Sequence, residues 1–273
     1  MAFDSSNNMS FLTHRRKAFR AGGASYLLDD YGTGVAVAYS LRVLSSSFAN
    51  LDLIEVREDG GDTTDTFTAA EITDGTLATF CGANNGFVRT WYDQSGNANN
   101  ATQTTDADQP QIVTAGVVNT DGGKPCLTLS GGTVEMTTGS EISAGKSFAG
   151  VAGTDGSSGF NYLLGGTGDG GVRTDGTSQW STSQKTNGQS FEAGGSQYID
   201  SVEITADIAA TTTRLIFLNS DADGFSIKLS KIGGTYVNRH WSGTIQEMIC
   251  WTTDASANRT SIESEINAHY SIY

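Results

Sequence analysis

Short apolar stretches alternate with turns rich in Gly, Ser and Thr through most of this 273-residue chain. Runs of strand character occur at 51–58, 87–93, 111–118 and 125–131, and the same style continues from 146 to 235. Apolar runs of this length between turn residues predict β-strands. The run WSGTIQEMICWTTD, beginning at Trp241, has apolar residues on both alternating sides, so it predicts a strand buried in the middle of a sheet.

Residues 34–47 have a different periodicity. Apolar side chains recur there and just beyond at helical spacing, at Val37, Leu41, Leu44 and Phe48. This spacing predicts a helix on the N-terminal side of the strands.

A second helix is predicted at the C-terminus. Ile262, Ile266 and Tyr270 form an i, i+4, i+8 stripe that would pack on a sheet, and Asp254 or Ser256 can cap the first turn. We find no internal repeat and no linker after residue 25. The pattern therefore predicts an all-β, double-sheet domain over residues 26–273 with two short helices.

Residues 1–25 differ from the rest of the chain in charge. They carry four bases against one acid, Asp4, which leaves 12 bases against 29 acids in the rest of a chain whose formal charge is −14. We interpret them as a basic attachment arm on an acidic body that is unsuited to nucleic acid. The arm residues expected to make the attachment are Phe11, Leu12, Arg15, Arg16, Lys17, Phe19 and Arg20.

The three cysteines, Cys81, Cys126 and Cys250, are odd in number and widely spaced, which favours buried free thiols over disulfides or a metal site. No stretch has the length of a membrane span, and the N-terminus has no apolar run typical of a signal peptide. These features predict assembly in a reducing cytoplasm, without a cofactor.

The stretch FVRTWYDQSGNANNATQ, residues 87–103, is the strongest candidate for chemistry. Its aromatic and amide side chains fit either a sugar site or a polar turn, and we favour a turn because the amides follow the strand end directly. The residues concerned are Trp91, Tyr92, Asp93, Gln94 and Asn97.

Two other kinds of site have weaker signals. Asp221 and Asp223 in DADG could contribute to a calcium loop, although the further ligands of such a loop are missing. His240 and His269 lack a nearby nucleophile motif, so no catalytic triad is predicted.

The segments VAVAYSLRVLSSSF, DGGDTTD and FCGANNGFVRTWYDQSGNANNATQ resemble the catalytic domain of the fungal arabinofuranosidase B family of glycoside hydrolases. That family has a concanavalin-like, laminin-G-like β-sandwich, so the resemblance implies a jelly roll of this type. It places Asp221 at the acid/base position. The position of the nucleophilic Glu falls at Gly166 and Thr167, with Asp169 nearby, and the adjacent cysteine pair of the family is absent.

The two ends of the chain resemble laminin-G-like virion proteins of tailed bacteriophages, through the basic start and the finish GTIQEMICWTTDASANRTSIESEINAHYSIY. We therefore predict a non-enzymatic virion protein, a capsid decoration or tail component. It would be assembled in the host cytoplasm in several copies and docked to other virion proteins through its arm. The alternatives are a module that binds host-surface glycans and, less favoured, an arabinofuranosidase-like hydrolase using Asp221 and Asp169.

Overall fold

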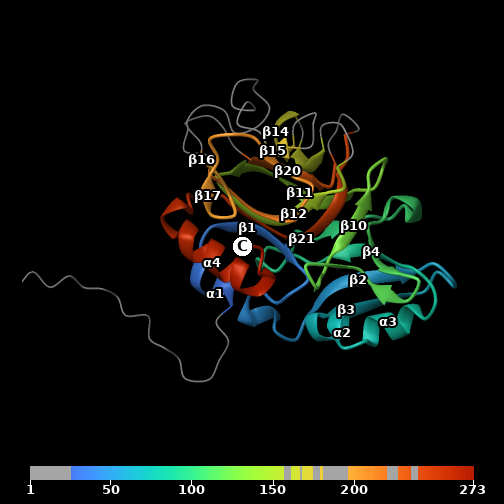
Figure 1. Ribbon diagram of the computed structural model, residues 1–273. Helices are drawn as coiled ribbons and strands as arrows, with labels where there is room; N and C mark the ends of the chain where they lie inside the picture. The colour runs from blue at the N-terminus through green and yellow to red at the C-terminus, as the bar shows by residue number, and fades with distance from the viewer. Residues whose placement is uncertain are drawn as a thin grey trace, which may run out of the picture.

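The computed structural model describes residues 26–156, 161–166, 168–174, 179–180, 196–219, 227–234 and 239–273. Its strands form a hydrogen-bonded network of 17 strands that folds into two stacked halves, with helices covering one of them (Figure 1). The predicted β-sandwich is confirmed. The predicted arm, residues 1–25, lies outside the described residues, so its boundary with the sandwich stays a prediction.

The half of the sandwich beneath the helices, called the helix-covered sheet here, runs in the order β17, β16, β19, β12, β21, β1. β21 is an interior strand, as its apolar residues on both alternating sides predict: it pairs with β12 on one side and with β1 and β10 (Leu127–Ser130) on the other. The strands are β1 (Val35–Ser40), β12 (Ser147–Thr154), β16 (Ser196–Ile199), β17 (Val202–Glu203), β19 (Arg214–Asn219) and β21 (Ser242–Trp251).

The opposite sheet, named so from here on, runs in the order β14, β13, β20, β11, β5, β4, β2, β3. Its strands are β2 (Asp52–Glu58), β3 (Thr64–Thr68), β4 (Gly86–Trp91), β5 (Ala101–Thr102), β11 (Met136–Gly145), β13 (Tyr162–Gly166), β14 (Gly168–Arg173) and β20 (Ile227–Ile232). The two sheets are joined where β10 (Leu127–Ser130) pairs with both β21 and β6 (Gln111–Thr114), and β6 pairs with β4 and with β7 (Val117–Val118). The described residues also form two separate two-stranded ribbons. One pairs β8 (Thr120–Asp121) with β9 (Lys124–Pro125), and the other pairs β15 (Gln179–Trp180) with β18 (Ile208–Ala209).

Helices α1 (Leu27–Tyr31) and α4 (Arg259–Tyr270) lie together on the outer face of the helix-covered sheet (Figure 1). Helices α2 (Ala69–Thr73) and α3 (Thr76–Cys81) lie at the other end of the molecule, beside β3. Among the described residues, no helix is long and apolar enough to cross a membrane.

Two apolar clusters follow from this layering. The main core lies between the sheets and includes Phe148, Met248 and Leu229, while a second cluster beneath α1 and α4 includes Phe217 and Trp251. Because the helix-covered sheet is packed on both faces, all eight residues of β12 are buried. Burying one large apolar side chain contributes about 1.5–3 kcal/mol, so these two clusters supply most of the driving force for folding.

The helix predicted over residues 34–47 is wrong: residues 35–40 form β1, and a short 3-10 turn follows at Ser46–Phe48. The misleading signal has a physical cause. Five of the six β1 side chains are buried, because α1 and α4 cover one face and the opposite sheet covers the other. A strand buried on both faces loses its alternation and imitates other periodicities.

The C-terminal helix is confirmed, with Ile262, Ile266 and Tyr270 all buried against the sheet. Its predicted cap is wrong. Asp254 accepts a hydrogen bond from the backbone N–H of Ser256, at 2.8 Å, in the turn before the helix, and α4 itself begins at Arg259 without a side-chain cap bond.

Candidate functional site

The turn after β4 binds the open edge of β1. In the described part of the chain β1 pairs only with β21, so the backbone groups on its other edge need partners. The buried carboxylate of Asp93 accepts the Ala38 N–H at 2.8 Å and the Ser95 N–H at 2.9 Å on one oxygen. Its other oxygen accepts the Ser95 hydroxyl at 2.7 Å and the Asn99 N–H at 3.1 Å. All four bonds are internal to the protein.

Gln94 and Trp91 continue along the same edge. The Gln94 amide donates to the carbonyls of Ser40 and Arg42, at 3.2 and 2.9 Å, and accepts the Leu44 N–H at 2.8 Å. The buried Trp91 indole N–H also donates to Ser40 O, at 3.2 Å. These contacts make both side chains part of the scaffold.

Asn97 and Asn99 link this turn to two other strands. Asn97 Nδ2 donates to the carbonyls of Val35 and Ala36, at 3.0 and 2.9 Å. Asn99 imitates a strand backbone: its Oδ1 accepts the Ser140 N–H at 2.7 Å, and its Nδ2 donates to Ser140 O at 2.9 Å. The turn is therefore a bridge between β1 and β11.

The four tryptophans, near the turn and elsewhere, offer little open surface. Trp91, Trp180, Trp241 and Trp251 are each no more than 4% exposed, and Trp180 packs against Trp241 with ring centroids 5.9 Å apart. Tyr92 is half-buried, and burial raises the pKa of its hydroxyl. A sugar at the turn would thus meet amides and hydroxyls more readily than the face of an indole ring.

A groove of about 690 Å³ opens between the start of β1 and the bulged part of β11, with the turn as its floor. It is called the β1–β11 groove here. Its lining combines amide, hydroxyl, backbone and small apolar groups: Gly34, Val35, Ala36, Asn97, Ala98, Asn99, Gly139, Ser140, Ile142 and Thr252. Sequence reasoning missed Ser140 and Thr252, because neither has a local motif and each is brought to the groove only by the fold.

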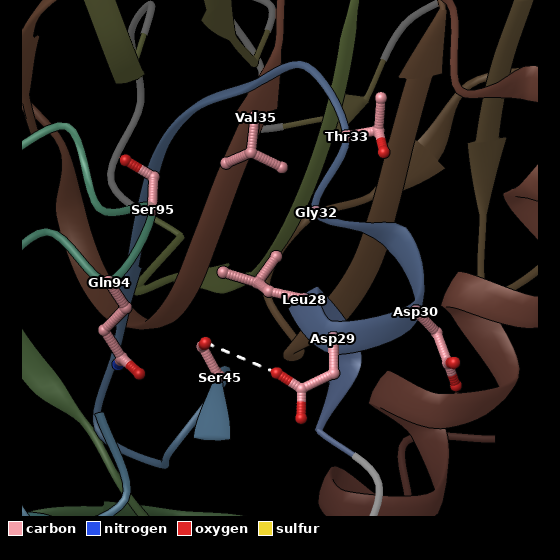
Figure 2. A pocket seen from close by; sticks show the side chains of 9 residues that line it. All are labelled: Leu28, Asp29, Asp30, Gly32, Thr33, Val35, Ser45, Gln94 and Ser95. Atoms are coloured by element: carbon pink, nitrogen blue, oxygen red, sulfur yellow. Dashed lines mark hydrogen bonds between the residues drawn. The ribbon is translucent and has the colours of Figure 1, made fainter. Parts of the chain in front are cut away.

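A smaller hollow of about 310 Å³ lies on the other side of the turn, beside α1 (Figure 2). Asp29 is already occupied there, since it accepts hydrogen bonds from the Ser46 N–H and hydroxyl at 3.0 Å and from the Ser45 hydroxyl at 3.4 Å. Figure 2 shows Asp30 pointing away from Asp29 toward α4. The two carboxylates do not converge as a catalytic pair would.

Of the two carboxylates expected from the resemblance, Asp169 lies in a strand of the opposite sheet. Asp169 is the second residue of β14, and β14 forms a hairpin with β13 through the pair Gly166–Gly168. Asp221 and Asp223 lie outside the described residues, in the segment that joins Asn219 to Ile227.

Strand register brings the described strand ends beside these two segments to one end of the sheet. β13 and β20 are antiparallel neighbours with Gly165 opposite Lys231, so the end of β13 at Gly166 and the start of β20 at Ile227 point to the same side. No group of three His, Cys, Asp or Glu side chains that could hold a metal occurs within the described ranges.

Three solved structures of arabinofuranosidases match this fold. A GH54 α-L-arabinofuranosidase with a cyclic sulfate inhibitor matches with a TM-score of 0.57 at 16% identity, over 89% of this chain and 65% of that one. An arabinofuranosidase in complex with arabinofuranosyl-α-1,2-xylobiose matches with a TM-score of 0.53 at 15% identity, over 89% of this chain and 64% of that one. A point variant of a GH54 enzyme soaked with 4-nitrophenyl α-L-arabinofuranoside gives a TM-score of 0.54 at 16% identity, over 89% and 65%.

The chain therefore has the β-sandwich fold of the GH54 arabinofuranosidases, and it spans slightly less than two thirds of their length. No protein-family model and no curated protein matches the sequence. At this level of identity the likeness establishes the fold.

These matches contradict the prediction of a non-enzymatic bacteriophage virion protein. They give no support to a capsid or tail role, and they favour the hydrolase alternative. The finish that resembled virion proteins is β21 followed by α4, an interior strand and a covering helix of this sandwich. A buried strand followed by a covering helix is a feature of the fold, so it does not indicate that the protein belongs to a virion.

Proposed function

We propose that this protein is a glycoside hydrolase that releases arabinofuranosyl groups from a glycan. The observation that carries the proposal is the match of 89% of the chain to α-L-arabinofuranosidases. Because the chain covers only 65% of those proteins, the proposal concerns the activity of the sandwich itself.

Strand order supports a catalytic pair on the opposite sheet. A retaining glycosidase needs two carboxyl groups about 5–5.5 Å apart. The β13–β14 hairpin carries Asp169, and the segment that carries Asp221 leads into β20, which is the neighbour of β13. The strand ends next to these carboxylates, at Gly166 and Ile227, are 61 residues apart in sequence and lie at the same end of one sheet, as such a pair requires.

Each carboxylate would have a distinct role. We assign Asp169 as the nucleophile that attacks the anomeric carbon and forms a glycosyl ester as the glycosidic bond breaks. Asp221 would give its proton to the departing oxygen and then take a proton from the water that hydrolyses the ester. Both carboxylates return to their starting state at the end of the cycle.

Hydrolysis of 4-nitrophenyl α-L-arabinofuranoside tests the proposal. We expect release of 4-nitrophenol by the wild-type protein, and a loss of about 100-fold or more in kcat in Asp169→Asn and in Asp221→Asn. Glu203→Gln is the matched control, because Glu203 is exposed on β17, in the other sheet. Absence of turnover by the wild type, or wild-type rates in both Asp variants, would contradict the assignment.

Azide separates the two roles. With a good leaving group, the Asp221→Asn variant should stall at the glycosyl ester, because it lacks the base that activates water. Azide needs no base, so it should restore turnover in Asp221→Asn and form an arabinofuranosyl azide with retained configuration. Equal restoration in Asp169→Asn with the same product would reverse the assignment.

A further inference from the structure

The β1–β11 groove is built into the fold and has fixed walls. Asn97 holds the start of β1 through two carbonyls, and Asn99 holds the β11 bulge through both backbone groups of Ser140. The bulge arises because Thr137 pairs with Lys231 while Ile142 pairs with Leu229, so extra β11 residues loop out between these pairs. A preformed hollow of this size lies in the range of ligand sites.

The charge of the groove sets it apart from the rest of the protein. All ten lining residues are uncharged, in a chain with 30 acidic and 16 basic residues and a formal charge of −14. A cationic ligand would find no carboxylate in this lining, and an anionic ligand would find no base to offset the acidic body. The lining therefore suits a neutral ligand.

The groups around the groove can bind hydroxyls. Asn97 uses its Nδ2 on β1, while its side-chain oxygen accepts no hydrogen bond from any described residue, and the exposed Ser140 hydroxyl is likewise unpaired in the described part of the chain. The exposed Ala98 and the half-buried Ile142 add apolar surface between these polar groups. Amides and hydroxyls beside small apolar patches match the alternating surface of a sugar.

The groove also lies close to the proposed catalytic end of the opposite sheet. β20 separates β11 from β13: Ile142 pairs with Leu229 on one side, and Gly165 pairs with Lys231 on the other. Two strand spacings put Ile142 roughly 10 Å from the end of β13. A chain several sugars long could occupy both places at once.

We propose that the β1–β11 groove binds the main chain of an uncharged polysaccharide and presents its side groups to the catalytic end of the sheet. The presentation rests on the proposed hydrolase function, whereas binding in the groove does not. Binding and turnover are therefore measured separately.

Affinity gel electrophoresis of the full chain in soluble arabinoxylan, a neutral polymer, tests the groove. Ser140→Arg and Thr252→Arg place a bulky side chain at two exposed positions of the lining and should weaken retardation at least about tenfold in Kd. Ser143→Arg is the matched control, because Ser143 is exposed on the same strand but does not line the groove. It should keep wild-type affinity, and circular dichroism should show that all three variants are folded.

Three results would overturn the proposal: no retardation of the wild type, equal retardation of the groove variants and the wild type, or stronger binding to an acidic polymer such as carboxymethylcellulose. Failure of the proposed hydrolase function would give a different set of results from failure of the groove proposal. In that case arabinoxylan binding would still depend on Ser140 and Thr252, while 4-nitrophenyl α-L-arabinofuranoside would not be turned over.

Discussion

Replacing Asp93 by Asn removes a single charge from the turn that protects the edge of β1. The amide oxygen can keep the bonds from the Ala38 and Ser95 N–H groups. The new NH2 group cannot accept the Asn99 N–H, although the Ser95 hydroxyl can rotate to accept from it. One buried backbone donor is therefore left without a partner.

The expected cost follows from these bonds. An unsatisfied buried donor costs about 1–3 kcal/mol, and bonds to a neutral oxygen are weaker than those to a carboxylate by about 1 kcal/mol each. Relief from burying a charge offsets part of this sum. We expect Asp93→Asn to lower the free energy of unfolding by about 2–4 kcal/mol.

Equilibrium urea unfolding followed by tryptophan fluorescence measures the change. Asp65→Asn is the control, since Asp65 is exposed on β3 and its side chain accepts, among the described residues, only the neighbouring Thr66 N–H. Its effect should stay within about 0.5 kcal/mol. A value for Asp93→Asn within the same 0.5 kcal/mol of wild type would refute the edge-protecting role of the turn.

Other predictions concern buried titratable groups. Burial, with nearby Arg42 and Lys124, lowers the pKa of His269 to about 4 from 6.5, so the unfolded chain takes up a proton first and stability falls as the pH drops from 6.5 to 4. Melting temperatures measured across this range should fall less in His269→Gln than in wild type; parallel curves would contradict the prediction. Arg42 makes two bonds to the buried Glu247 carboxylate, at 2.7 and 3.0 Å, so Arg42→Ala should cost roughly 3–5 kcal/mol in urea unfolding, and a cost below 1 kcal/mol would argue against a buried pair. Burial raises the pKa of the three thiols to about 11 or 12, so at pH 8 a disulfide reagent should label them only after denaturation, and rapid labelling of the folded protein would contradict their burial; they are Cys81, Cys126 and Cys250.

The parts of the fold that were predictable from sequence are those in which burial leaves a simple pattern. The apolar residues on both alternating sides of β21 and the stripe of Ile262, Ile266 and Tyr270 each record which faces are covered. Burial on both faces made the strand prediction for β21 right, and the same burial made the helix prediction for β1 wrong. Both faces of β1 are covered, and a run of six residues is too short to distinguish a strand from a helix by periodicity.

The candidate site was less predictable because its contacts join distant segments. The amide-rich turn was visible as composition, but the partners of Asn99 lie 41 residues away on a bulge that leaves no sequence signal. The prediction of a non-enzymatic virion protein has a related cause, because it also relied on a short segment of sequence. That prediction rested on the absence of a Glu from one short segment at Gly166 and Thr167, whereas the likeness to arabinofuranosidases lies in the arrangement of the strands.

The stereochemistry of arabinose release tests the central claim most directly. Proton NMR during hydrolysis of 4-nitrophenyl α-L-arabinofuranoside by the wild-type protein identifies the anomer that forms first, before mutarotation mixes the two. The proposed pair of Asp169 and Asp221 predicts α-L-arabinofuranose as the first product, because a retaining enzyme inverts the anomeric carbon twice. Release of the β-anomer would contradict the retaining mechanism, and absence of any sugar release would contradict the proposed function.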